Sequence, residues 1–209
     1  MITLTPVLER WSVGCPFWSV DQAEFFLAVP RKPTAQQVGG VVWALIGRSV
    51  TADDLSITAP DAASAIADYL AHDDEDFAPG GLRVGADEVV IDPGCCVGLD
   101  EWRDWLGVGG GEVIDLGHSP DVLMEHRGQV VRVWKDVDQL SRAAVPGPDE
   151  PNIDIPRSAL PELLGAVQRD LVGFLTALQL WARGIHADLA EPLAIAIDKR
   201  LQISAPLGL

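Results

Sequence analysis

Two adjacent cysteines, Cys95 and Cys96, are the residues of this sequence best suited to chemistry. They lie in "IDPGCCVGLDEWRDWLGV", where Pro-Gly ends a strand-like run and a helix-like segment follows. A thiol at such a turn, near the amides of a helix N-terminus, can act as a nucleophile if a base lies beside it. His118 and His126 are the nearest histidines, but no catalytic signature surrounds either. The acidic residues that flank the pair also disfavour a thiolate, because like charges repel. A thiol-dependent or hydrolytic enzyme that uses Cys95 or Cys96 with His118 is therefore the alternative function.

A metal site built on this pair would use both cysteines, His118 and either His126 or Cys15. Zinc sites usually space paired ligands two to four residues apart, and adjacent cysteines fit that rule poorly. A disulfide between neighbours is disfavoured in a reducing compartment, and three cysteines are too few for a disulfide scaffold. We therefore expect no catalytic residue, no metal and no cofactor.

The preferred interpretation of the stretch is architectural. Pro93-Gly94 stops a buried strand, the two thiols fill the corner that follows, and a short helix begins at Leu99. Helical spacing places Leu99, Trp102 and Leu106 on one face, with Trp105 at its edge. This pattern predicts buried tryptophans, whereas a functional alternative leaves one of them exposed as an anchor for a partner.

The chain is strongly acidic, with 15 lysines and arginines against 31 aspartates and glutamates, and a formal charge of −16. Nucleic acids and anionic membranes need cationic surfaces, so both are poor partners. No lysine or arginine occurs in 49–82, where eight acids gather. An acidic surface speeds encounter with a basic protein. The predicted contact residues are Asp53, Asp54, Asp73, Asp74, Glu75 and Asp76.

Several common signals are missing from the sequence. "GVGGGE", 107–112, lacks the Gly-Lys-Ser/Thr of a phosphate loop, and no Gly-x-Ser-x-Gly or His-Glu-x-x-His motif occurs. The sequence does not open with a basic segment and an apolar run, and no stretch reaches the ~18 apolar residues of a membrane span. We therefore expect a cytoplasmic protein.

The hydrophobic pattern predicts a mixed α+β fold in which helices pack on a small β-sheet. Its clearest signal is a long amphipathic helix over 160–185, followed by a second, shorter helix near 190–203. We expect a single domain over 1–209, made of a mixed part (1–145), a Pro- and acid-rich linker (146–156) and a helical part (157–205) packed on it. The other expected elements are a strand in 25–29, a helix in 34–47 capped by Thr34, a helix in 59–72, a buried strand in 87–94, and a hairpin in 122–134 that turns at Arg127-Gly128.

Three segments give the chain a family resemblance: "VVIDPGCCVGLDEWRDW", "LGHSPDVLMEHRGQVVRVWKD" and the leucine-rich helix with "LPELL". They resemble uncharacterised actinobacterial proteins of this pattern, which are similar to immunity proteins of polymorphic toxin systems, including the SMI1/KNR4-like group. The motif residues are Pro93, Gly94, Cys95, Cys96, Gly98, Leu99, Trp102 and Trp105. The resemblance implies a non-enzymatic, acidic protein-binding domain that neutralises a basic toxin. A structural or regulatory module with another partner is a second alternative.

Overall fold

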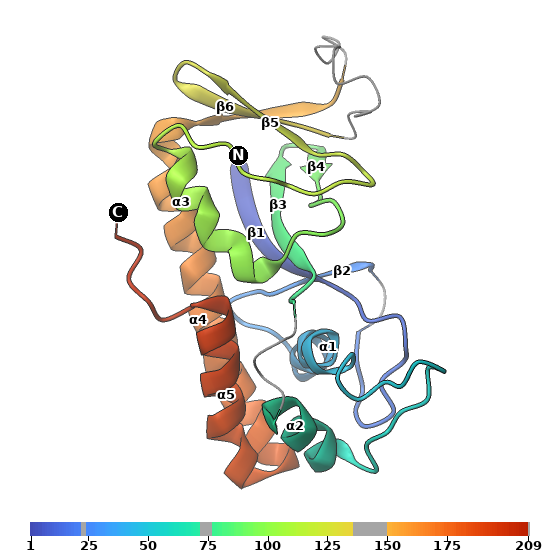
Figure 1. Cartoon of the computed structure of the whole chain (residues 1–209). Coiled ribbons are helices and arrows are strands. Elements are labelled where there is room, and N and C mark those ends of the chain that lie inside the picture. Colours follow the sequence, from blue (N-terminus) through green and yellow to red (C-terminus); the bar gives the residue numbers. More distant parts are fainter. Residues whose placement is uncertain (22–23, 72–76, 136–149, 209) are drawn as a thin grey trace. The chain divides into compact units, whose positions relative to one another are not determined.

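The computed structural model describes residues 1–21, 24–71, 77–135 and 150–208. These residues form a mixed α+β fold with two antiparallel sheets and helices α1 to α5 (Figure 1), which confirms the predicted fold class. The chain divides into two compact units. Unit 1 comprises Met1–Val7, Pro79–Gln168 and Pro206–Leu209, and unit 2 comprises Leu8–Ala78 and Arg169–Ala205. The single domain over 1–209 stays a prediction.

The first sheet has the strand order β2-β1-β3-β4. Its strands are β1 (Ile2–Glu9), β2 (Phe26–Ala28), β3 (Gly80–Ala86) and β4 (Val89–Ile91). Strand β4 lies at an edge and pairs antiparallel with β3, so that Ile91 faces Val84. Ile91 is buried, but Val90 is 40 % exposed. The predicted strand is confirmed, and its prediction as fully buried is wrong, because successive side chains of an edge strand point alternately to the core and to solvent.

The second sheet belongs to unit 1 and has the order β5-β6-β7. Strands β5 (Leu123–Arg127) and β6 (Val130–Trp134) form the predicted hairpin, with the turn one residue later than expected, at Gly128-Gln129. Residues 152–156, the end of the predicted linker, form strand β7 (Asn152–Pro156). Ile153 and Ile155 are buried there, and the proline is tolerated because it closes an edge strand.

The segment after the cysteine pair is a 3₁₀ helix, η1 (Leu99–Asp104), that continues into the short helix α3 (Trp105–Val108). A 3₁₀ helix has about 3 residues per turn, so residues three apart lie on one face. Leu99, Trp102 and Trp105 are accordingly buried, with Trp102 at 0 % and Trp105 at 3 % exposure, whereas Leu106 is half-buried. The placement of Trp105 at the edge of the face is therefore wrong, and so is the alternative of an exposed tryptophan anchor.

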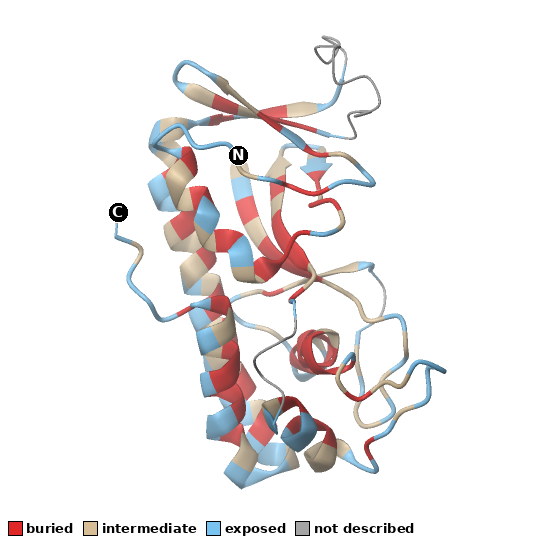
Figure 2. Cartoon of the chain, viewed as in Figure 1, coloured by how far each residue is buried: buried red, intermediate tan, exposed pale blue. Residues whose placement is uncertain are grey.

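Helix α1 (Ala35–Ile46) lies in unit 2 and is buried along most of its length (Figure 2). Thr34 is its N-cap, as predicted, and forms a capping box with Gln37. Gly39 is required inside this helix because a Cβ there would come 2.7 Å from the Trp18 ring. The indole Nε1 of Trp18 also donates to the carbonyl oxygen of Gly39 at 2.9 Å. Close packing against Trp18 thus offsets the low helix propensity of glycine.

Three further helices confirm the periodic patterns. They are α2 (Ala62–Ala71), α4 (Leu160–Ile185), which a 3₁₀ turn (Arg157–Ala159) precedes, and α5 (Ala187–Leu201). Within unit 2, α2 packs against α5. The buried side chains of α4 recur at helical spacing: Leu160, Leu164, Val167, Leu171, Phe174, Leu178 and Ala182. Among the described helices, none combines the length and the apolar character that crossing a membrane requires.

Phe174 gives a direct test of the packing of α4 in unit 2. Its ring is 0 % exposed, and Phe174→Ala should lower the free energy of unfolding by about 3–5 kcal/mol, because it removes buried surface and leaves a cavity. The matched control is Leu180→Ala on the same helix, where the side chain is 74 % exposed and the change should stay within about 0.5 kcal/mol. Urea unfolding measures both. Equal losses in the two variants would contradict the orientation of α4.

Candidate functional site

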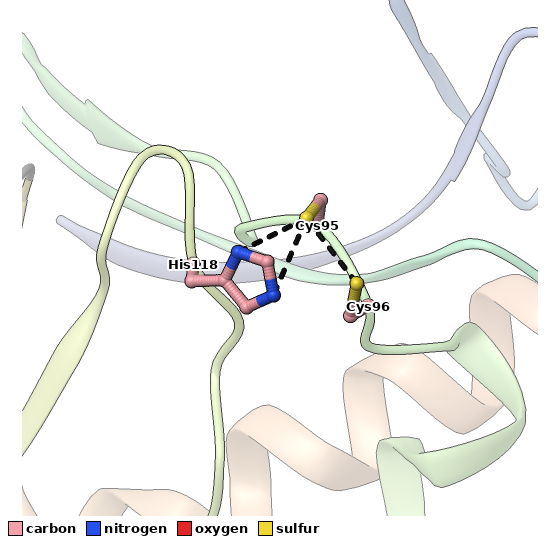
Figure 3. A group of neighbouring side chains, drawn as sticks. All are labelled: Cys95, Cys96 and His118. Carbon is pink, nitrogen blue, oxygen red and sulfur yellow. Dashed lines mark hydrogen bonds between the residues drawn. The ribbon is translucent and has the colours of Figure 1, made fainter.

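The sulfurs of Cys95 and Cys96 and the imidazole of His118 form one cluster in unit 1 (Figure 3). The two sulfurs are 3.3 Å apart. The sulfur of Cys95 is 3.2 Å from Nδ1 of His118 and 3.7 Å from Nε2. The cluster therefore joins the two cysteines to a histidine 23 residues further along the chain. The structure places Cys95 in direct contact with one of the two histidines considered as its base.

Backbone pairing brings the two segments together. Cys95 and His118 form an isolated antiparallel bridge, in which the amide of Cys95 donates to the His118 carbonyl at 2.6 Å and the His118 amide donates back at 3.2 Å. The Gly94 amide donates to the carbonyl of Leu116 at 2.8 Å. A reciprocal pair of hydrogen bonds fixes which residues face each other. The contact between thiol and imidazole thus follows from main-chain geometry.

Two glycines allow this pairing. A Cβ on Gly94 would lie 2.4 Å from the carbonyl carbon of Gly117, and a Cβ on Gly117 would lie 2.6 Å from the carbonyl carbon of Gly94. Gly117 also has φ +87°, a left-handed conformation that side chains disfavour. Any other residue at either position would push the segments apart. The glycines of "DPGCC" and "DLGHS" are therefore the sequence signal of the site.

Cys96 adopts an unusual backbone conformation, with φ +69°. In an extended strand, successive side chains point to opposite faces, so Cys95 and Cys96 would normally point apart. The left-handed conformation of Cys96 accompanies the approach of the two sulfurs to 3.3 Å. Such a conformation costs a non-glycine residue of order 1–3 kcal/mol, and it is often found at functional sites.

The cluster is accessible to solvent. Cys96 and His118 are exposed and Cys95 is half-buried, so the prediction that two thiols fill a buried corner is wrong. The other motif residues are buried, among them Pro93, Gly94 and Gly98. The segment thus turns its backbone and tryptophans inward and its thiols outward.

The negative charge of one acidic residue beside the cysteine pair is balanced by an arginine. Asp92 forms an ion pair with Arg83, which lies on β3. This pairing weakens the argument that flanking carboxylates disfavour a thiolate, because a paired carboxylate repels a second anion less. Glu101 also has a local role, since its Oε2 accepts a hydrogen bond from the Gly98 amide at 3.3 Å. The sequence alone did not reveal these partners.

The other residues considered for this site do not join the cluster. Among the described residues, the ligand-type group at this position contains only Cys95, Cys96 and His118. The Nε2 of His126 is hydrogen-bonded to the Glu112 carbonyl at 2.8 Å. Cys15 belongs to unit 2, and burial raises the pKa of its thiol, although backbone hydrogen bonds partly oppose the shift. Cys15 is therefore a natural reference thiol.

The predicted acidic contact surface is only partly described. Asp53 and Asp54 are exposed in a turn of unit 2. The side chain of Asp54 accepts hydrogen bonds from the hydroxyl and the amide of Ser56, which lower the pKa of this carboxyl. Asp73, Asp74, Glu75 and Asp76 lie outside the described residues. A surface that combines both runs stays a prediction.

No family model, curated protein or solved structure matches the chain. The resemblance to immunity proteins therefore stays a prediction.

Gly117 provides a test of the backbone contact, with Gly128 as its control. Both glycines have positive φ, +87° and +62°, so alanine at either should cost about 1–2 kcal/mol from the left-handed backbone. Only Gly117→Ala also meets atoms of the opposite segment, whereas nothing lies within 4 Å of a Cβ on Gly128. We expect Gly117→Ala to lower the free energy of unfolding by at least about 1 kcal/mol more than Gly128→Ala does. Urea unfolding gives both values, and equal losses would exclude the close contact.

Proposed function

We propose that the chain carries a dithiol redox centre, in which Cys95 and Cys96 interconvert between two thiols and a disulfide. The observation that carries the proposal is the position of the Cys95 sulfur, 3.3 Å from the Cys96 sulfur and 3.2 Å from Nδ1 of His118. The sequence alone favours a non-enzymatic protein. The contacts among the three residues favour thiol chemistry instead, because they place a base and a resolving thiol beside one sulfur.

A hydroperoxide is the oxidant that suits an exposed dithiol. His118 takes the proton of Cys95, and the resulting thiolate attacks the peroxide oxygen and breaks the O–O bond, giving a sulfenic acid on Cys95. The proton held by His118 passes to the departing alkoxide, which leaves as one molecule of alcohol. The Cys96 thiol then attacks the Cys95 sulfur, which forms the disulfide and releases one water. Two thiols and one hydroperoxide thus yield one disulfide, one alcohol and one water. The base and the resolving thiol of these steps both lie in contact with the Cys95 sulfur.

The disulfide should be easy to reduce. The peptide bond between Cys95 and Cys96 is trans, which holds neighbouring Cα atoms about 3.8 Å apart. Most disulfides join Cα atoms ~4.4–6.8 Å apart, and strained or exposed disulfides are the labile ones. A bond of this kind fits a cycling centre better than a structural crosslink.

Oxidation of the reduced, full-length protein tests this function. With a chelator present, an alkyl hydroperoxide should remove two hydrogen atoms from the peptide that contains Cys95 and Cys96, as read by mass spectrometry. Cys95→Ser and Cys96→Ser should abolish this change, and Cys15→Ser should leave it intact.

His118→Gln should slow the reaction at least about tenfold, because it removes the base. The matched control is His186→Asn at the exposed N-cap of α5. If oxidation yields only sulfinic acid or disulfides between chains, the dithiol proposal fails.

A second candidate function is binding to a basic protein, as an immunity-type domain that neutralises a toxin. The specific observation in its favour is charge: the chain carries −16, and residues 49–82 contain eight acids and no lysine or arginine. Asp53 and Asp54 are exposed within that stretch. The proposed mechanism is steric and electrostatic, with an acidic surface covering a cationic active-site cleft.

Co-expression with the product of the neighbouring gene tests this second function. The chain should relieve the toxicity of that product and bind it, and Asp53→Asn with Asp54→Asn should weaken binding several-fold, because fewer charges attract the partner. Asp188→Asn with Glu191→Gln removes the same charge from exposed positions on α5 and serves as the control. A neighbour that is not toxic, or a toxic one that the chain does not bind, would refute the proposal.

A further inference from the structure

We infer that Cys95, Cys96 and His118 also bind a thiophilic metal ion, with Zn²⁺ as the expected cation. The three side chains each offer one ligand atom, and these atoms all lie within 4.8 Å of one another. Two thiolates and an imidazole form a soft ligand set that suits zinc. Calcium and magnesium prefer oxygen ligands and do not suit this set.

Two of the three separations within the cluster are close to those that one ion needs. With Zn–S bonds of about 2.3 Å and a Zn–N bond of about 2.0 Å, two sulfurs on a tetrahedral ion lie ~3.8 Å apart, and a sulfur and a nitrogen lie ~3.5 Å apart. The two sulfurs here are 3.3 Å apart, and Nε2 of His118 is 3.7 Å from the Cys95 sulfur. The two sulfurs would therefore move apart by roughly half an ångström, and the third pair of ligand atoms, on Cys96 and His118, lies within 4.8 Å.

The left-handed backbone of Cys96 answers the objection that adjacent cysteines rarely share an ion. The rule against neighbouring ligands assumes an extended or helical backbone, on which consecutive side chains diverge. At φ +69°, Cys96 instead has its sulfur beside that of Cys95. Adjacent cysteines weigh against a metal site in the sequence, but the local conformation brings both sulfurs to the same side.

The surrounding backbone holds the ligands in place without an ion. The bridge between Cys95 and His118 fixes one side of the cluster, and a second bridge, between Pro79 and Gly98, fixes the chain just beyond Cys96. Nδ1 of His118 is 3.4 Å from the hydroxyl oxygen of Ser119. A ligand histidine commonly uses its second nitrogen for such a contact, so Nε2 is the nitrogen assigned to the metal.

Three protein ligands leave one tetrahedral position open to solution. Cys96 and His118 are exposed, so an ion can enter the cluster and exchange its fourth ligand. Sites of this type differ from closed structural zinc sites, which use four protein ligands. The metal site does not rest on the dithiol chemistry, but the two exclude each other in time, because the sulfurs of a disulfide are no longer thiolates.

Cobalt titration of the full-length protein tests the site. Under a phosphine reductant and without oxygen, Co²⁺ should bind with a stoichiometry of one per chain and give the sulfur-to-metal charge-transfer absorption of thiolate ligation. Added Zn²⁺ should displace the bound Co²⁺.

Cys95→Ser and Cys96→Ser should each weaken binding at least about tenfold and reduce the charge-transfer band, and His118→Gln should weaken binding while the band persists. Cys15→Ser and His186→Asn are the matched controls and should bind as the unmodified chain does. Circular dichroism checks that each variant is folded.

The possible outcomes separate the metal site from the redox centre. Absence of the charge-transfer band, a band of undiminished intensity in both Cys95→Ser and Cys96→Ser, or loss of the band in Cys15→Ser would overturn the metal site. Because the titration is done on reduced protein and the oxidation assay contains a chelator, each result stands alone. Metal binding without internal disulfide formation would support the metal site and refute the dithiol centre. Internal disulfide formation without metal binding would support the dithiol centre and refute the metal site.

Discussion

The close approach of two backbones, at Gly94 and Gly117, is the constraint on which the cluster depends. No side chain fits between them, because a Cβ on either glycine would come within 2.4–2.6 Å of the other segment. Because the two glycines let the backbones come this close, the bridge between Cys95 and His118 can form, and the side chains of these two residues meet. The contact between thiol and imidazole therefore depends on the absence of side chains at Gly94 and Gly117.

The segment around the cysteine pair has a buried side and an exposed side, and the buried side holds the exposed side in place. On the buried side, Leu99, Trp102 and Trp105 align because the chain starts as a 3₁₀ helix, and they hold the segment in the core of unit 1. The Gly80 amide adds a hydrogen bond to the Val97 carbonyl at 3.1 Å. With its backbone held in this way, the segment can keep Cys96 in a left-handed conformation that a loose loop would abandon.

The elements were predictable from sequence wherever one local pattern decided them. The leucine stripe of α4 and the capping Thr34 of α1 needed no knowledge of distant contacts. Strand β7 was hidden because prolines and acids dominate its surroundings, although Ile153 and Ile155 alternate as in any edge strand. Trp105 was misplaced because helical spacing of 3.6 was assumed where the chain has 3.0.

The cluster itself could not be predicted from local sequence. Nothing near "GCC" indicates that His118 is its neighbour, since the pairing of the two segments spans 23 residues and rests on main-chain hydrogen bonds. The ion pair between Asp92 and Arg83 was hidden for the same reason. Both cysteines and the histidine were named as candidates from the sequence, but their contact with one another became visible only in the fold.

The left-handed backbone conformation of Cys96 affects which residues we expect at this position in related sequences. Glycine and asparagine adopt this conformation at the least cost, so drift that preserved only the fold would favour one of them there. Cysteine has no such preference for this conformation, so the fold alone does not favour it at position 96. On the proposed dithiol or metal chemistry, related sequences that use the pair should keep Cys-Cys, and Cys-Gly or Cys-Asn would mark sequences that keep only the scaffold.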